Sequence, residues 1–189
     1  MLFTVRLLIG FIFTFLTSIT QAQEPIFRLS QTEGKSYIGC FLSVYQDSTQ
    51  MMRVEDVISD SLSFKPSKTD VPNFNVSNYN NWIRIKFIND SEEENLILNI
   101  SNPSIDEVTL YELKNGAIDS LKLTINQSFE DRFFKHQFYT FGLNVDINDT
   151  ATYYLKLASK KQLLLPLSIT SQEKVVIELV SYYLYRRKR

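Results

Sequence analysis

Between residues 81 and 169 the chain is a succession of short alternating segments separated by turn signals. Apolar side chains fall at every second position, the period of a half-buried β-strand, in NWIRIKFIN, LILNIS, EVTLYELK, SLKLTIN, HQFYTFGLNV, ATYYLKLAS and LLLPLSIT. Turn sequences separate them, among them DSEEEN, NPSID and the hairpin signal Asn115-Gly116. With an earlier strand in SYIGCFLSVYQD, about eight strands at this spacing predict an antiparallel jelly-roll β-sandwich, with an up-and-down barrel as the main alternative.

Two segments depart from the alternation and predict helices at either end of this all-β fold. STQMMRVEDVISD places Met51, Val54, Val57 and Ile58 at helical spacing, which indicates a short early helix or helical turn. In TSQEKVVIELVSYYLYRRKR, Thr170 and Glu173 have the spacing of a capping box and a largely apolar run follows, which predicts a C-terminal helix. Its RRKR end is either a solvated helix terminus or a basic anchor near anionic lipid.

The first residues have the pattern of an export signal. A single early cation, Arg6, precedes a long apolar run that ends in small residues at Thr20 and Ala22, and an uncleaved membrane anchor is the alternative. We therefore expect an exported protein in the periplasm or on the outer face of the cytoplasmic membrane. The expected organisation is a signal peptide (1–22), a lead-in segment (23–35), a β-sandwich that binds ligand (36–170) and an amphipathic C-terminal helix with a basic end (171–189).

Composition excludes several function classes. The net charge of −1 argues against a nucleic-acid partner, and a single cysteine, Cys40, cannot form an internal disulfide. The sequence has no glycine-rich phosphate loop, no Cys/His cluster and no Gly-x-Ser-x-Gly elbow, so we expect no metal, no cofactor and no enzymatic activity. A hydrolase with two facing carboxylates is a minor alternative, because the acidic groups cluster in turns where solvation explains them.

The segment NNWIRIKFIND contains the first candidate binding residues. As a strand it places Ile83, Ile85 and Phe87 on one face, and Trp82 and Arg84 on the other. Trp82 could stack on a sugar ring while Arg84 donates hydrogen bonds to hydroxyls or a carboxylate. The alternative is a tryptophan packed beneath a loop, with Arg84 covering it through a cation–π contact.

Three further residues complete the predicted ligand site. Tyr111 lies on the opposite face from Leu110 and adds a second aromatic ring, while Arg132 and His136 come just before an aromatic strand. Ordinary structural roles are the alternative for the last two: an arginine paired with a neighbouring carboxylate, and a histidine bonded to backbone. The predicted ligand-binding residues are thus Trp82, Arg84, Tyr111, Arg132 and His136.

The order of several motifs resembles a known family. The matching pattern is a tryptophan-arginine strand in NWIRIKFIND, NPSID leading into VTLY, an arginine and a histidine in FEDRFFKHQFYTFGL, and YYLKL before LLLPLSI. Over about residues 36–170 the chain resembles the type-2 extracellular domain of bacterial seven-transmembrane receptors with diverse intracellular signalling modules. The resemblance implies a jelly-roll sandwich related to carbohydrate-binding modules, outside the cytoplasmic membrane, that senses a ligand for attached signalling machinery.

The sequence departs from that family by stopping at SYYLYRRKR, where the receptors continue into membrane helices. A stand-alone sensory module, a partner of a separate membrane signalling protein and a truncated receptor are the three alternatives. Our leading hypothesis is an exported, non-catalytic sensory domain that binds a carbohydrate or another small polar ligand. The competing hypothesis is a structural or protein-interaction sandwich of the cell envelope, and the oligomeric state is left open.

Overall fold

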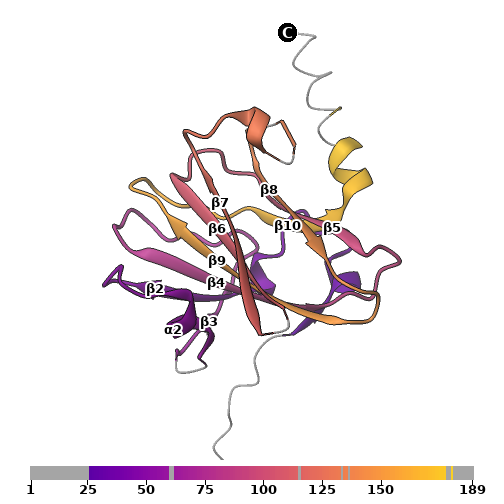
Figure 1. Cartoon of the computed structure of the whole chain (residues 1–189), viewed down its shortest axis with the longest axis horizontal. Helices are drawn as coiled ribbons and strands as arrows, with labels where there is room; N and C mark the ends of the chain where they lie inside the picture. Colours follow the sequence, from indigo (N-terminus) through magenta and orange to yellow (C-terminus); the bar gives the residue numbers. More distant parts are fainter. Residues whose placement is uncertain are drawn as a thin grey trace, which may run out of the picture.

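The computed structural model describes residues 26–59, 62–114, 116–132, 134–135, 137–177 and 180. Within them, ten strands form two sheets that face each other as the layers of a sandwich (Figure 1). The predicted all-β class with largely antiparallel sheets is confirmed, and the layers are those of a sandwich rather than a barrel. The jelly-roll connectivity stays a prediction. The predicted signal peptide and most of the predicted C-terminal helix lie outside the described residues.

The larger sheet has the order β3-β2-β4-β9-β6-β7. Its strands, in that order, are Lys65–Pro66, Ser43–Asp47, Asn80–Ile88, Thr150–Ala158, Glu107–Lys114 and Ala117–Thr124. Neighbours along this order are antiparallel, and the short strand β1 (Phe27–Arg28) adds a parallel pairing to β4. The hairpin predicted at Asn115-Gly116 connects β6 and β7, because Lys114 pairs with Ala117.

The smaller sheet has the order β10-β5-β8, with strands Leu167–Ser171, Asn95–Ile100 and Tyr139–Asn144. Pro166 lies immediately before β10, an edge strand of this sheet, as its lack of a backbone N–H predicts. The register places Ser168 opposite Asn99 and Thr170 opposite Ile97. These four side chains share the outer face, since the intervening Leu167, Ile169 and Leu98 belong to the core.

The main core fills the space between the two sheets. The predicted alternation in β4 is confirmed: Ile83, Ile85 and Phe87 are buried in this core, whereas Trp82 belongs to a second cluster. The rest of the large sheet contributes alternate residues of β9, β6 and β7, and the small sheet contributes alternate residues of β5, β8 and β10. The core-facing residues are Tyr153, Leu155, Leu157, Val108, Leu110, Leu123, Leu96, Leu98, Ile100, Tyr139, Phe141, Leu143, Leu167 and Ile169.

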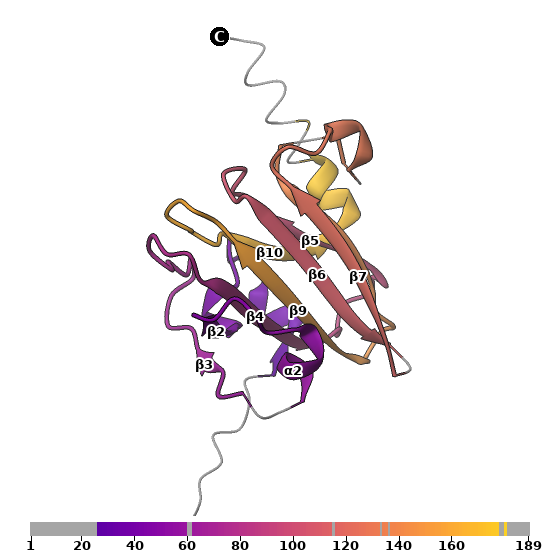
Figure 2. The ribbon, with the colours of Figure 1, turned by 60° about the vertical axis from the view of Figure 1, so that its left-hand side comes forward.

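A second packing layer covers the outer face of the large sheet. The chain between β2 and β3 contains the short helix α2 (Val54–Ile58), as predicted, and α2 lies in front of that sheet (Figure 2). The second cluster has Val57, Trp82 and Tyr154 at its centre. The apolar residues of α2 are thus accounted for by packing on the sheet.

Short 3₁₀ turns replace part of one expected strand. The predicted strand in SYIGCFLSVYQD begins only at Ser43, because Gly39–Phe41 form the 3₁₀ turn η2. A β-carbon at Gly39 would collide with the Asp70 carbonyl oxygen, so this close backbone approach requires glycine. Two further 3₁₀ turns are η1 (Leu29–Thr32) and η3 (Phe129–Asp131). Among the described residues, no helix combines the length and apolarity needed to cross a membrane.

Candidate functional site

The structure brings Trp82, Arg84 and Tyr111 together on the outer face of the large sheet. The Trp82 and Tyr111 ring centroids are 5.6 Å apart, and the Arg84 guanidinium lies 4.5 Å from the centre of the Phe64 ring. The Trp82 side chain is 0% exposed and Arg84 is 8% exposed, because the segment containing α2 lies over them. This arrangement is the packed alternative, with one difference: the cation over the indole ring is Lys156, at 5.5 Å, whereas Arg84 lies over Phe64.

The cover over this face is too well packed to open readily. Six apolar side chains of the covering segment, Met52, Val54, Val57, Ile58, Leu62 and Phe64, belong to the second cluster. Full burial of one such side chain contributes about 1.5–3 kcal/mol, so even partial burial of six makes removal cost on the order of 5 kcal/mol. Fewer than about one molecule in a thousand would then be open. Ligand binding by Trp82, Arg84 and Tyr111 stays a prediction, one that requires the cover to be displaced.

Burial also acts on the ionisation and hydrogen bonding of this face. The pKa of Tyr111 is raised, mainly because burial disfavours the phenolate, with a smaller contribution from Glu107. The buried indole N–H of Trp82 has no acceptor among the described residues. An unpaired buried donor costs about 1–3 kcal/mol, which the packing of the second cluster must offset.

The other two predicted site residues lie in the β7–β8 connection. The Arg132 side chain donates hydrogen bonds to the carbonyl oxygens of Gln137 (2.9 Å) and Thr124 (3.0 Å). Its guanidinium also lies over two aromatic rings, 4.9 Å from the centre of Phe129 and 4.8 Å from that of Tyr139. In this structure Arg132 therefore fastens the connection to the end of β7. His136 lies outside the described residues, and its predicted role is untested.

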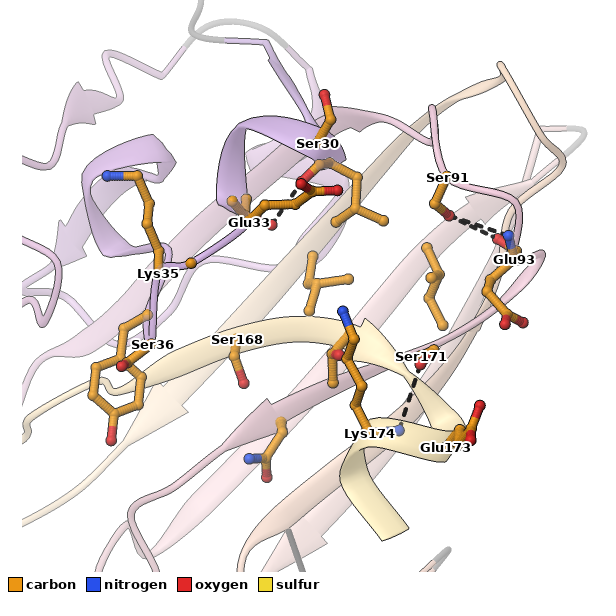
Figure 3. A pocket seen from close by; sticks show the side chains of 18 of the residues that line it. Ser30, Glu33, Lys35, Ser36, Ser91, Glu93, Ser168, Ser171, Glu173 and Lys174 are labelled. Carbon is orange, nitrogen blue, oxygen red and sulfur yellow. Dashed lines mark hydrogen bonds between the residues drawn. The ribbon is translucent and has the colours of Figure 1, made fainter. Parts of the chain in front are cut away.

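An open cleft of about 1000 Å³ lies elsewhere, beside the small sheet (Figure 3). Its floor includes Asn99 of β5, together with Ser168 and Thr170 of β10, from the outer face of that sheet. Three walls surround the floor. They are residues 29–37, which extend two residues past the predicted lead-in segment and are called the lead-in segment from here on, the β4–β5 turn at residues 90–93, and the helical segment that follows β10 (residues 172–177). These parts are far apart in the sequence and meet only in the fold.

A carboxylate joins two of these walls. Asp90 accepts hydrogen bonds from the Ser30 backbone N–H (2.8 Å) and the Ser30 hydroxyl (2.6 Å), and Arg28 Nη1 lies 3.9 Å from the same carboxylate. The Ser30 hydroxyl and amide bonds, with a smaller contribution from Arg28, hold the pKa of Asp90 below its ordinary value. The lead-in segment is also tied to the sheet, because the Ile38 amide donates to the Leu167 carbonyl at 2.8 Å. Together these bonds fix one side of the cleft.

The turn that forms the second wall is organised by one buried amide. Asn89 is 0% exposed, and its side-chain nitrogen donates to the carbonyls of Glu93 (2.7 Å) and Val145 (2.8 Å). Its side-chain oxygen accepts from the amide and hydroxyl of Ser91. Because every one of these groups would otherwise need water, the turn is held in one shape by satisfied buried bonds.

Polar side chains predominate in the lining of the cleft, with Leu29, Leu96, Ile169 and Ile177 as its apolar part. Hydroxyl and amide groups come from Ser30, Thr32, Ser36, Tyr37, Ser91, Asn99, Ser101, Ser168, Thr170 and Ser171. The charged groups are Glu33, Asp90, Glu92, Glu93 and Glu173 against Lys35 and Lys174, so carboxylates outnumber ammonium groups. No cluster of three or more metal-ligating side chains occurs in the part of the chain that the structure describes. Such a lining suits hydrogen bonding to a hydrophilic, uncharged or cationic molecule.

Sequence reasoning did not identify this cleft. In the sequence the acidic turn DSEEEN is explained by solvation, and the lead-in segment has no motif that indicates a site. The alternation of β5 and β10 did place Asn99, Ser168 and Thr170 on the faces opposite their core residues. The sequence does not show that β10 pairs with β5, and this pairing brings the three side chains together on the floor of the cleft.

Comparison with protein families gives one finding. A family model described as 7TMR-DISM extracellular 2 matches residues 39–171, more than half of the chain. A search of curated proteins finds no match. The matched range contains every strand of the two sheets except β1, together with the floor of the cleft.

Proposed function

Because the chain belongs to the 7TMR-DISM extracellular 2 family, whose members are exported sensory domains of receptors, we propose that it binds a small polar ligand in the cleft beside the small sheet. A carbohydrate is the ligand class that fits best. The polar cleft of about 1000 Å³ is the observation on which the proposal rests. This volume lies at the upper end of small-molecule sites, large enough for one or two sugar rings.

The floor supports this choice of ligand. Ser168, Thr170 and Asn99 present hydroxyl and amide groups that both donate and accept hydrogen bonds, as sugar hydroxyls require. Tyr37 adds an aromatic ring to the lead-in wall, where the C–H face of a sugar ring could stack. The excess of carboxylates favours neutral over acidic sugars, because an anionic ligand would meet like charge.

Binding without chemical conversion is the proposed mode of action. The family is a sensory one. Of the carboxylates around the cleft, Asp90 is already held by Ser30, and the glutamates are exposed to solvent, which explains their charge without a catalytic role. The partner in this proposal is a membrane signalling protein, and the compartment is the periplasm or the outer face of the cytoplasmic membrane. The domain would report ligand occupancy to that protein.

A binding screen tests the proposal. We expect at least one of cellobiose, galactose and N-acetylglucosamine to raise the melting temperature of the purified protein and to give a calorimetric isotherm, whereas glucuronate should bind more weakly. Ser168→Phe places a ring on the cleft floor and should lower affinity at least about tenfold, which corresponds to about 1.4 kcal/mol. Ser120→Phe, at an exposed serine of β7 on the other sheet, is the matched control and should bind normally.

Two results would contradict this assignment. If none of the sugars binds, carbohydrate sensing by this domain is wrong. If a sugar binds equally well to Ser168→Phe but loses affinity in Tyr111→Ala, the ligand site is the outer face of the large sheet that the sequence predicted.

A further inference from the structure

The third wall of the cleft differs from the other two in how it is held. The lead-in segment and the β4–β5 turn are joined by the Ser30–Asp90 hydrogen bonds. The helical segment at residues 172–177 follows directly from Ser171, the last residue of β10, and its Lys174 amide lies 3.5 Å from the Ser171 hydroxyl. Its attachment to the domain thus depends on how its side chains pack.

One side chain of this segment is buried. Val175 is 2% exposed, whereas the adjacent Val176 and Ile177 are 42% and 57% exposed. Ile97, on the outer face of β5, is also buried, although alternation turns it away from the main core. From the burial of these two side chains we infer that the segment rests on the small sheet through a narrow apolar contact, whereas Val176 and Ile177 are exposed.

The same segment contributes side chains to the cleft. Glu173, Lys174 and Ile177 line it, and the Lys174 side chain extends from the helix toward the middle of the cleft (Figure 3). No ion pair or side-chain hydrogen bond of the Lys174 ammonium occurs within the described part of the chain. A ligand on the floor of Ser168 and Thr170 would meet three available N–H donors on this residue.

We propose that Lys174 is a ligand contact through which occupancy of the cleft holds the helical segment against the small sheet. This inference rests on the proposed function and adds to it the structural change that reports ligand binding, namely docking of the helical segment. A ligand that bonds both the floor and Lys174 stabilises the docked segment, because it loses one set of bonds when the segment leaves. Such coupling is reciprocal: the factor by which ligand stabilises docking equals the factor by which undocking weakens binding.

Three variants of the full chain separate the parts of this proposal. Lys174→Met keeps the apolar stem but removes the ammonium group, so it should weaken binding while leaving the segment docked. Val175→Asp buries a carboxylate at the apolar contact and should release the segment. Val176→Asp places the same charge on the exposed neighbouring residue and is the matched control for it.

The probe is whichever of cellobiose, galactose and N-acetylglucosamine binds most tightly to the unchanged protein. We expect saturating probe to slow hydrogen exchange of the amides at 172–177 about five-fold or more. By reciprocity, Val175→Asp should lower probe affinity by a factor similar to that slowing. Lys174→Met should lose both the probe-dependent slowing and part of the affinity, and Val176→Asp should change neither.

The outcomes distinguish failure of this coupling from failure of the proposed ligand binding. If no probe binds the unchanged protein, the proposed function fails and the coupling fails with it. If a probe binds and Ser168→Phe abolishes binding, but Val175→Asp and Lys174→Met keep full affinity, the cleft is the site and only the coupling is wrong. Unchanged exchange at 172–177 with saturating probe would equally overturn the coupling.

Discussion

The packing over Trp82 can be tested by removing one ring from the covering segment. Phe64 lies over the Arg84 guanidinium at 4.5 Å and contacts the rings of Tyr45 and Tyr154, with centroids 5.9 and 6.4 Å away. Truncating a fully buried phenylalanine to alanine costs about 3–5 kcal/mol. Since Phe64 is only partly buried, we expect Phe64→Ala to lower the free energy of unfolding by about 2–3 kcal/mol, including the lost cation–π contact.

Urea unfolding followed by the fluorescence of Trp82, the only tryptophan in the chain, measures this loss at the site concerned. The native indole should be shielded from acrylamide, and Phe64→Ala should increase quenching. Met51→Ala is the control, because Met51 lies in the same connection but is 84% exposed, and its loss should be within about 0.5 kcal/mol. If Phe64→Ala costs no more than the control and leaves quenching unchanged, the segment does not pack on Trp82 as described.

Three other perturbations have expected outcomes. Burial alone would raise the pKa of Asp47, but hydrogen bonds from the Thr49 side chain and nearby amides lower this pKa below its ordinary value. Its stabilisation is therefore present at neutral pH and is lost as pH falls through the lowered pKa. Asp47→Asn should be less stable near neutral pH, with a gap that narrows in melts at about pH 3. Gly39→Ala should lower stability by about 1–3 kcal/mol in urea titrations, because its methyl group meets the Asp70 carbonyl; an unchanged midpoint would contradict that close approach. Tyr139→Phe removes a 2.5 Å hydrogen bond to the Ile105 carbonyl and should cost about 1–2 kcal/mol by the same titration, whereas no loss would mean that water replaces the hydroxyl.

Alternation in the sequence predicted the large-scale fold because its cause is local. Ile83, Ile85 and Phe87 reach the core, and Trp82 faces away from it, since side chains of a strand alternate whatever the strand pairs with. What lies over the second face depends on a distant segment, and α2 occupies the place where a ligand was expected to stack. An aromatic residue on the outer face of a strand is consistent with a covering segment and with a bound ligand, because aromatic rings suit buried packing and ligand stacking equally.

The cleft follows from strand register rather than from any motif. Ser168 faces Asn99 across the β10–β5 pair, and Thr170 faces Ile97. A slip of one residue would turn Leu167 and Ile169 outward and bury the polar side chains, so the core that fixes the register also fixes the polar floor. The walls are added by segments whose own sequences predict only turns and a helix. Hence a related chain should have this cleft where it keeps polar residues at the positions of Asn99, Ser168 and Thr170 and the three wall segments, even if its tryptophan-arginine strand is altered.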